Sequence, residues 1–247
     1  MRCCGLLLAL AAPGFCQASA QISPPASPSS VDQRIASAQK KIRGDPKSWQ
    51  GYNDLAAAYC RKGRDNSDAA TYRQAQAALD RSFQLSPANY DVEKLQVTVW
   101  LGEQRVADAL KLASQLNNKV HDDIGVWGLL VDCNVALGNL KEAERDAQWI
   151  LDLRSGSALG FEKAAGLRVL FADPEGAIEF YQEANRRTSA NDADQHAWLL
   201  TQIAKIELAR GNVKAAEDRV REALKLFPDS QLALAVESKV RMVQAKR

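Results

Sequence analysis

This sequence contains little histidine and carries little net charge. Two of its 247 residues are His, and the formal net charge is +2. Neither His121 nor His196 has a second His or a Cys at metal-ligand spacing, and no phosphate-cradling glycine loop or nucleophile elbow is present. The near-neutral balance gives no reason to propose nucleic acid or an anionic membrane as a partner. We therefore expect no enzyme, no metal site and no cofactor.

Aromatic residues are also scarce, at 6% of the chain, whereas Ala and Leu are abundant. Ala and Leu lose little on entering a helix, so the composition favours an all-α fold. Three of the five Cys fall in the first 16 residues. The other two, Cys60 and Cys133, lie in apolar helical surroundings. We therefore expect two buried free thiols rather than a disulfide framework.

The first 20 residues predict a cleavable signal peptide. Arg2 precedes an uncharged apolar run over residues 3–15, and Ala18-Ser19-Ala20 supplies the small-x-small pattern of a cleavage site after Ala20. The run is shorter than the about 20 residues that a membrane span needs. An uncleaved anchor helix and a lipoprotein at Cys16 remain alternatives. Residues 21–30 are rich in Pro and Ser and predict an extended linker. We expect a secreted or periplasmic protein with no membrane span in the mature chain.

An internal repeat determines the expected fold. Five dipeptides with the character of turns between helices recur at intervals of 34 to 39 residues: Lys62-Gly63, Leu101-Gly102, Leu137-Gly138, Phe171-Ala172 and Arg210-Gly211. An apolar, often small residue stands seven positions before each: Ala56, Leu95, Val131, Ala165 and Ala204. An alanine follows four of the turns at a fixed distance: Ala107, Ala143, Ala177 and Ala216. In the first repeat the matching alanine, Ala75, comes seven residues late, which indicates an insertion within residues 64–71.

A period near 34, made of a helix, a Gly turn and a second helix that starts with a small residue, resembles the tetratricopeptide-repeat (TPR) family. The first repeat matches that family's pattern through Tyr52, Leu55, Ala56, Tyr59, Ala75, Leu79 and Pro87. The third matches through Trp127, Leu130, Val131, Leu137, Gly138, Ala143 and Ala147. The fourth and fifth match through Phe161, Ala165, Ala177, Tyr181 and Ala184, and through Ala204, Gly211, Ala216, Ala223 and Pro228.

The resemblance implies an all-α, right-handed superhelical α-α solenoid of about five TPR helix pairs. The repeats are expected at about 45–87, 88–120, 121–156, 157–191 and 192–228. Residues 31–44 are expected to form an N-terminal half-repeat that caps the first pair. Residues 229–247 become more polar and are expected to form a C-terminal capping helix.

In the TPR family the first helices of the pairs line an inner groove that binds peptide or helical segments. Transferred onto this sequence, the groove positions are Gln50, Asn53, Arg61, Asn89, Val92, Gln96, Val99, Trp100, Gly128, Asp132, Glu162, Val169, Trp198, Thr201 and Lys205. Asn53 and Arg61 alone do not supply the clamp with which some family members hold an acidic C-terminus. We therefore expect a groove that binds apolar anchors of a peptide or helix.

The insertion within 64–71 is polar and is interpreted as a recognition loop or a longer turn, with Ser67 or Asp68 capping the next helix. The layout of the first repeat also looks like the TPR region of bacterial cytochrome c maturation proteins.

The sequence thus predicts an extracytoplasmic scaffold or adaptor that binds other proteins or peptides. Two alternatives stay open. One is a self-assembling structural repeat protein, which would be a homo-oligomer. The other is an accessory subunit of an envelope enzyme or maturation complex such as cytochrome c biogenesis.

Overall fold

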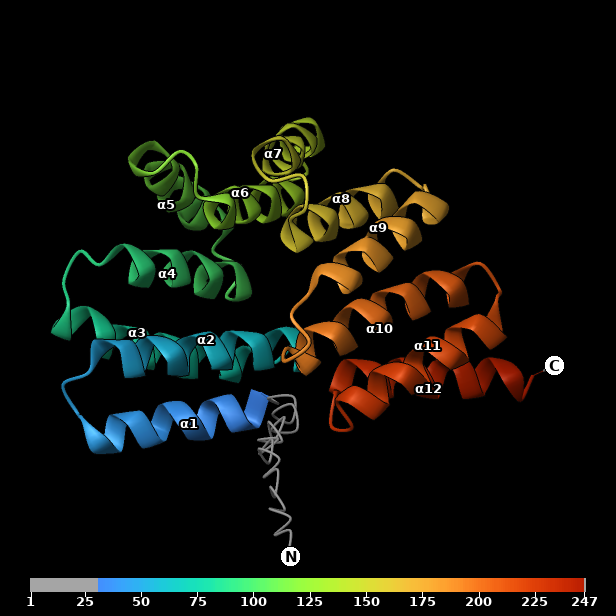
Figure 1. The fold of residues 1–247 in the computed structure, drawn as a ribbon, viewed down its shortest axis with the longest axis horizontal. Helices are drawn as coiled ribbons and strands as arrows, with labels where there is room; N and C mark the ends of the chain where they lie inside the picture. The colour runs from blue at the N-terminus through green and yellow to red at the C-terminus, as the bar shows by residue number, and fades with distance from the viewer. Residues whose placement is uncertain (1–30, 247) are drawn as a thin grey trace, which may run out of the picture.

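The computed structural model describes residues 31–246, so the predicted signal peptide and linker lie outside the described residues. Within this range the chain forms twelve helices and no strand (Figure 1). In order they are α1 (Val31–Gly44), α2 (Trp49–Asn66), α3 (Ala69–Leu85), α4 (Tyr90–Gly102), α5 (Val106–Lys119), α6 (Ile124–Leu137), α7 (Leu140–Leu153), α8 (Ala158–Leu170), α9 (Pro174–Arg187), α10 (Ala193–Ala209), α11 (Val213–Leu226) and α12 (Gln231–Gln244).

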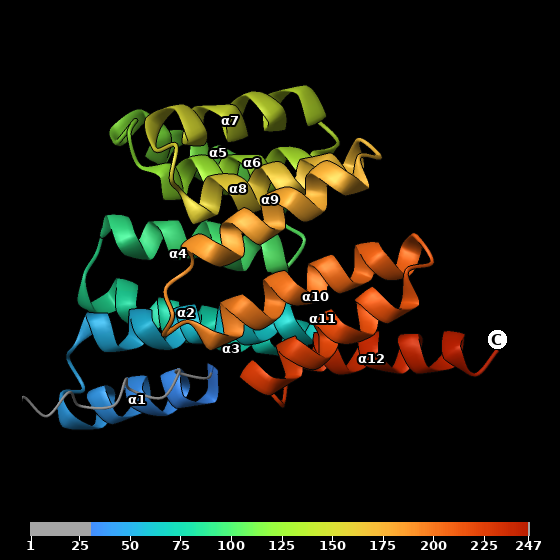
Figure 2. The same ribbon diagram turned by 45° about the vertical axis from the view of Figure 1, so that its right-hand side comes forward.

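The helices pack as consecutive antiparallel hairpins, which confirms the predicted all-α solenoid. Each helix lies against its neighbours in the chain, from α2 with α3 through α10 with α11, and the hairpins stack into a curved array (Figure 2). The first helices of successive pairs also contact one another, α2 with α4, α4 with α6 and α6 with α8. Helix α9 connects α8 to α10. Small residues at the hairpin contacts, such as Ala56, Ala75, Ala143 and Ala216, are fully buried and let the helix backbones approach closely.

The turns that end the helices agree only partly with the glycine pattern. Gly138 (φ 79°) and Gly211 (φ 80°) adopt the left-handed conformation expected of a helix-ending glycine. Ala172 (φ 56°) occupies the same place without a glycine. The prediction is wrong for Gly63, which lies inside α2, and for Gly102, which ends α4 while the left-handed residue is Gln104 (φ 64°).

Gly63 and Gly102 are required by a side chain and not by a turn. A Cβ on Gly63 would lie 2.7 Å from the Tyr72 ring, and a Cβ on Gly102 would overlap that ring. Tyr72, near the start of α3, therefore wedges between α2 and α4, and only glycine on both sides leaves room for it.

The insertion within 64–71 is helical, which corrects its interpretation as a loop or longer turn. Residues 64–66 extend α2 and residues 69–71 begin α3, with only Ser67 and Asp68 between the helices. The Asp68 carboxylate accepts a hydrogen bond from the Ala70 N–H at 2.9 Å and so caps α3, as predicted. The insertion thus makes the α2/α3 hairpin longer than its neighbours.

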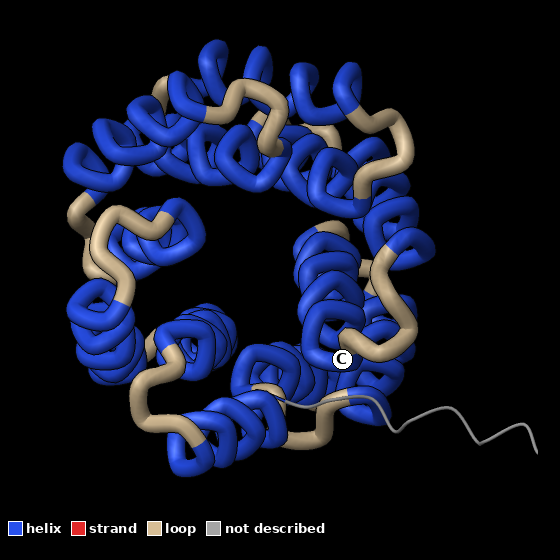
Figure 3. The backbone as a smooth tube through the Cα atoms, turned by 60° about the vertical axis from the view of Figure 1, so that its left-hand side comes forward, coloured by secondary structure: helices blue, strands red, loops and turns tan. Residues whose placement is uncertain are grey.

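The array closes on itself, so its two ends meet. The tube view shows the helices surrounding a central opening (Figure 3). Val31 of α1 is 3% exposed and belongs to the apolar cluster built by α10, α11 and α12, and Ile35 packs beside it. Helix α12 in turn contacts α2. Helix α1 therefore packs against both ends of the array and does not only cap the first pair.

Four charged side chains join the two ends, and we call them the ionic clasp: Arg34, Arg61, Asp192 and Asp194. Arg61 donates to Asp192 at 2.6 and 3.0 Å and to Asp194 at 2.7 Å, across 131 and 133 residues of chain. Arg34 of α1 adds a bond to Asp192 at 3.0 Å. Burial alone would raise the pKa of Asp192, but its hydrogen bonds and Coulomb attraction to Arg61 outweigh this and lower that pKa. Asp192 is therefore ionised at neutral pH.

The lengthened α2/α3 hairpin provides the other contacts between the ends. Arg64 donates to the Gln195 side chain at 2.7 Å, and its guanidinium lies 4.6 Å from the ring centre of Trp198. The Asp65 carboxylate accepts from Ser230 Oγ at 2.6 Å and from the Gln231 N–H at 2.8 Å, at the start of α12. We call these contacts, the clasp and the packing of Val31 together the ring closure.

We predict that Gly102→Ala lowers the free energy of unfolding by about 1–3 kcal/mol, because the new methyl group displaces the Tyr72 ring from its slot. Gly44→Ala is the matched control, since nothing lies within 4 Å of a Cβ there, and it should change stability by less than about 0.5 kcal/mol. Urea denaturation followed by circular dichroism measures both. Equal stability of the two variants would contradict the wedge.

We also predict that Arg61→Met opens the ring, because it leaves the Asp194 carboxylate, whose side chain is 4% exposed, with Arg34 Nε at 3.5 Å as its remaining cation. Arg61 is one-third exposed, so water screens part of the loss, and the expected destabilisation is about 2–3 kcal/mol. Small-angle X-ray scattering should show a larger radius of gyration.

Lys41→Met is the control for this variant. It breaks the exposed pair with Asp54 in the same part of the molecule and should cost less than about 1 kcal/mol with no change in radius. An unchanged radius for Arg61→Met would mean that the apolar packing of α1 closes the ring by itself.

Candidate functional site

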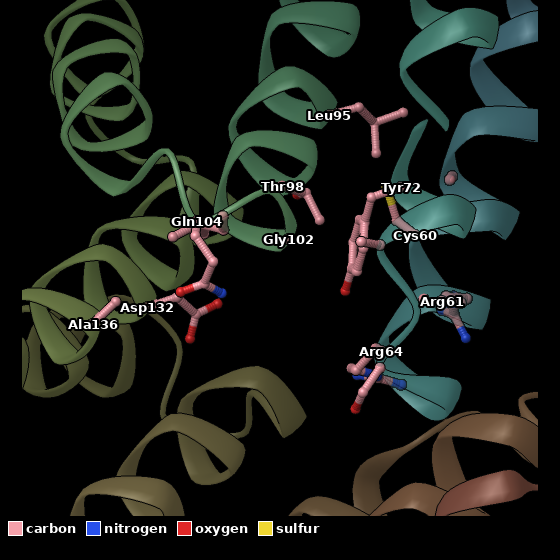
Figure 4. Close-up of a pocket in the computed structure, with 15 residues that line it drawn as sticks. Cys60, Arg61, Arg64, Tyr72, Leu95, Thr98, Gly102, Gln104, Asp132 and Ala136 are labelled. Carbon is pink, nitrogen blue, oxygen red and sulfur yellow. The ribbon is translucent and has the colours of Figure 1, made fainter. Parts of the chain in front are cut away.

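The main concavity of the protein opens on the inside of the ring, between α2, α3, α4 and α6. It has a volume of about 800 Å³ and we call it the central cavity. Arg61 and Arg64 of α2 lie on one side of it and Asp132 and Ala136 of α6 on the other, with Tyr72 between them (Figure 4). The volume is in the range of cavities that bind ligands in proteins.

Three smaller cavities share walls with the central cavity and extend it around the ring. One of about 300 Å³ shares Ala57 and Arg61, and one of about 350 Å³ shares Leu95 and Thr98. A third, of about 240 Å³, shares Asp132. The cavities therefore adjoin one another along α1, α2, α4, α6 and α8, and we call this concave surface the lumen.

The wall of the central cavity is largely apolar, apart from the charged Arg61, Arg64 and Asp132 and a few neutral polar groups. Ala57, Leu95 and Ala136 line it, and the hydroxyl of Tyr72 points into it (Figure 4). Burial raises the pKa of the Tyr72 hydroxyl, neighbouring Cys60 adds to this, and Arg64 opposes it. The hydroxyl is therefore protonated at neutral pH and can donate a hydrogen bond to a ligand.

Cys60 also lines the cavity, but it is a poor nucleophile. Burial raises the pKa of its thiol to about 12, so almost no thiolate exists at neutral pH. Cys60 and Cys133 are both buried and free, as predicted.

A series of ion pairs and hydrogen bonds links the helices that surround the lumen. Lys163 of α8 donates to the Asp132 carboxylate at 2.7 and 2.8 Å and lies 3.6 Å from Glu162. Glu162 accepts from the Gln195 side chain at 2.7 Å, and Gln195 accepts from Arg64. The chain of contacts thus runs from α6 through α8 and α10 to α2.

Burial and charge act in opposite directions on the central pair. Burial raises the pKa of Asp132, and the attraction of Lys163 offsets this only in part. Burial lowers the pKa of Lys163, but the attraction of Asp132 and Glu162 reverses the shift and raises it. Lys163 is therefore a protonated cation held by two carboxylates, and not a neutral amine ready for chemistry.

Five of the predicted groove residues lie on the lumen or at its edge. They are Asn53, Arg61, Asp132, Glu162 and Trp198. Four of these five already bind or stack on other protein groups. Asn53 differs, because its buried Oδ1 accepts no hydrogen bond within the described residues, although the side chain lines the cavity beside Leu95 and Thr98.

Five other predicted residues are buried in helix contacts and cannot line a groove, which corrects their assignment. Val92 and Val99 are 0% exposed in the core between α2, α3 and α4. Gln96 exchanges hydrogen bonds with Gln76 of α3 at 2.6 and 3.1 Å. Gly128 lies where a Cβ would be 3.1 Å from Leu159, and buried Thr201 donates to the Ala197 carbonyl.

The remaining predicted residues lie outside the cavities. The Asn89 side chain caps α4, and Trp100 is half-buried under the guanidinium of Arg105. Gln50, Val169 and Lys205 are exposed and line none of the cavities described above. Whether these residues contact a partner stays a prediction.

The error in the second repeat has a simple cause in its helical register. The inner face of α4 is formed by Asp91, Lys94, Leu95 and Thr98 rather than by Val92, Gln96 and Val99. A shift of one residue turns a helix by about 100°, which exchanges a buried face for an open one. The polar residues at 91, 94 and 98 follow helical spacing and would have identified the open face.

The two His lie away from the lumen contacts. His121 packs against Trp127 and Trp149 with ring centres 5.2 and 5.7 Å apart, and His196 bonds Asn185 and the Ser189 carbonyl. Within residues 31–246, no group of three or more His, Cys, Asp or Glu is placed to hold a metal ion. In the same range, no helix is both long and apolar enough to cross a membrane.

Comparison with known proteins identifies the fold. No protein-family model matches the chain, and no curated protein matches it in sequence. A thermophilic TPR protein of Thermus thermophilus is similar in structure with a TM-score of 0.62 and 15% identity, over 76% of this chain and 99% of that one. PilW, a widely conserved type IV pilus biogenesis factor, has a TM-score of 0.50 and 19% identity, over 83% of this chain and 90% of its own. At these identities the likeness shows the fold alone, an all-α solenoid of the TPR type.

Proposed function

We propose that this protein is an extracytoplasmic scaffold that binds an extended segment of a partner protein in its lumen. The observation that carries the proposal is the concave surface formed by the central cavity and the three cavities that share its walls. Such a surface offers a path for a chain segment and not a closed pocket for one small molecule.

The chemistry of the lumen supports a segment of low net charge. Its carboxylates are matched by cations: Asp132 and Glu162 by Lys163, and Asp192 and Asp194 by Arg61 and Arg34. A ligand that drew a charged group out of one of these pairs would leave its partner uncompensated at a partly buried site, which is costly. This supports the expectation that Arg61, whose charge is already paired, does not hold an acidic tail.

Neutral polar groups in the lumen suit a peptide backbone. The Tyr72 hydroxyl points into the central cavity, which Ser67, Thr98 and Gln104 also line. A backbone carbonyl of the ligand could accept a hydrogen bond from the Tyr72 hydroxyl, while an apolar side chain of the ligand packs against Ala57 and Leu95.

The lumen favours binding over catalysis. Its one thiol, Cys60, and its buried amine, Lys163, are both protonated at neutral pH and therefore poor nucleophiles. We accordingly propose no enzymatic activity for this chain.

The location outside the cytoplasm is proposed on the sequence of residues 1–20 alone. Mass spectrometry of the protein from the exporting cell tests it: the expected N-terminus is Gln21, and an intact Met1 would point to a retained anchor.

The self-assembling alternative receives less support from the structure. Helices α1 and α12, which would have to stack on other copies, pack instead within one chain through Val31 and through Asp65 with Ser230. Involvement in cytochrome c maturation remains a version of the scaffold proposal in which the partner belongs to that pathway.

We predict that Ala136→Arg weakens binding of a peptide segment by at least about tenfold, because an exposed alanine on the wall of the central cavity becomes a large cation. The probe is a display library of short linear peptides selected on the wild-type protein. The affinity of the selected peptides is then measured by isothermal titration calorimetry.

Ala77→Arg on α3 is the control, since Ala77 is exposed and lines none of the cavities. It should leave the affinity unchanged. Failure to select any peptide, or equal loss in both variants, would contradict binding in the lumen.

A further inference from the structure

The wall of the lumen has one junction, between α2 and α10, at which the two helices are not connected by a short turn. Between neighbouring repeats the wall is continuous, because each helix is tied to the next by a short turn. Between α2 and α10 the wall exists only through the ring closure, whose partners are separated by 131 to 166 residues of chain. If the ring closure opens, every repeat can stay folded.

The ring closure is also more polar than the other contacts in the ring. Consecutive hairpins are joined through buried apolar clusters such as Ala165, Tyr181, Leu199 and Ile203. The apolar part of the ring closure is Val31 with Ile35 beside it. The rest are ion pairs and hydrogen bonds, in which Arg34, Arg61 and Asp192 are partly exposed and Asp194 is buried. Exposed polar contacts are worth little compared with apolar burial, so this contact is the one expected to open first.

Two buried atoms show that the ring closure is not fully satisfied. Arg34 Nε and Asp194 Oδ1 are both buried without a hydrogen bond, although they face each other at 3.5 Å. Because a buried polar atom without a hydrogen bond lowers stability, the Arg34–Asp194 pair stabilises the closed ring less than a hydrogen-bonded pair would.

The same side chains close the ring and line the binding surface. Arg61 and Arg64 form part of the wall of the central cavity, and they also bond Asp192, Asp194 and Gln195. A ligand in the central cavity therefore touches the groups that hold the ring shut. Binding and opening must influence each other when they share these contacts.

We propose that the ring closure is a gate that opens to admit an internal segment of a partner and shuts around it. This inference rests on the proposed function and adds the kind of partner and its mode of entry. A free chain end can thread through a closed ring. An extended segment with folded domains on both sides cannot, so a ring that opens at one polar contact fits that partner.

The test locks the gate with a disulfide in the full chain. Asp65 and Ser230 have short side chains that meet at 2.6 Å, so Asp65→Cys with Ser230→Cys brings two thiols together across the ring closure. The native Cys60 and Cys133 are buried and stay apart from this pair. The same variant is measured oxidised and reduced, so that the two samples differ only in the bond.

Two probes separate the modes of entry. One is a library of linear peptides at the free end of a single folded carrier domain, and the other is the same library placed between two folded carrier domains. We expect the reduced protein to bind selected members of both libraries. Oxidation should lower the association rate of the two-domain probe by at least about tenfold and leave the free-ended probe much less affected.

A second variant moves the gate in the opposite direction. Arg34→Met removes one cation of the clasp from α1 and should raise the association rate of the two-domain probe more than that of the free-ended probe. Equal binding of both probes by the oxidised and reduced forms would overturn the gate and leave lumen binding intact. Absence of binding of either probe to the reduced protein would overturn lumen binding itself, and the gate with it.

Discussion

The contact between Arg61 and the pair Asp192 and Asp194 is the interaction on which the shape of this protein depends. It joins side chains that are more than 130 residues apart and turns a curved array of helix pairs into a ring. An open TPR array exposes a groove along its length. Here the same inner surface becomes the wall of a lumen. Access to that wall is therefore controlled by an ionic contact as well as by the helices that form it.

The insertion in the first repeat has a structural role that its sequence alone does not reveal. It lengthens both helices of the α2/α3 hairpin and places Arg64 and Asp65 against α10 and α12. The added length also positions Tyr72, which requires Gly63 and Gly102 on either side. One local change in length thus provides part of the ring closure, part of the cavity wall and the reason for two glycines.

The charges inside the ring serve structure first. Lys163, Asp132 and Glu162 hold one another, and Gln195 connects them to Arg64. Because buried or half-buried charges are costly without partners, matched pairs allow a polar lumen at low cost. What remains open for a ligand is the apolar wall, the Tyr72 hydroxyl and the Arg64 guanidinium, which bonds the neutral Gln195 side chain.

The local features of this protein can be predicted from its amino-acid sequence. Its period, its small residues at hairpin contacts and caps such as Asp68 predicted the helix pairs and the all-α solenoid, because these features depend on residues close in the chain. The family spacing also predicts Asn53, Asp132, Glu162 and Trp198 on the inner face, where they line the lumen.

The ring closure, the helical form of the insertion and the inner face of α4 depend on packing between residues that are far apart in the chain. Nothing in the sequence around Arg61 distinguishes it from a surface arginine, because its partners Asp192 and Asp194 lie more than 130 residues away. The small rotations between successive repeats add up over the whole chain and determine whether its two ends meet. A local sequence pattern does not predict the total rotation. In α4, the family spacing assigns Val92 and Val99 to the groove, but packing against α3 buries them. Lys94 and Thr98 face the lumen in their place.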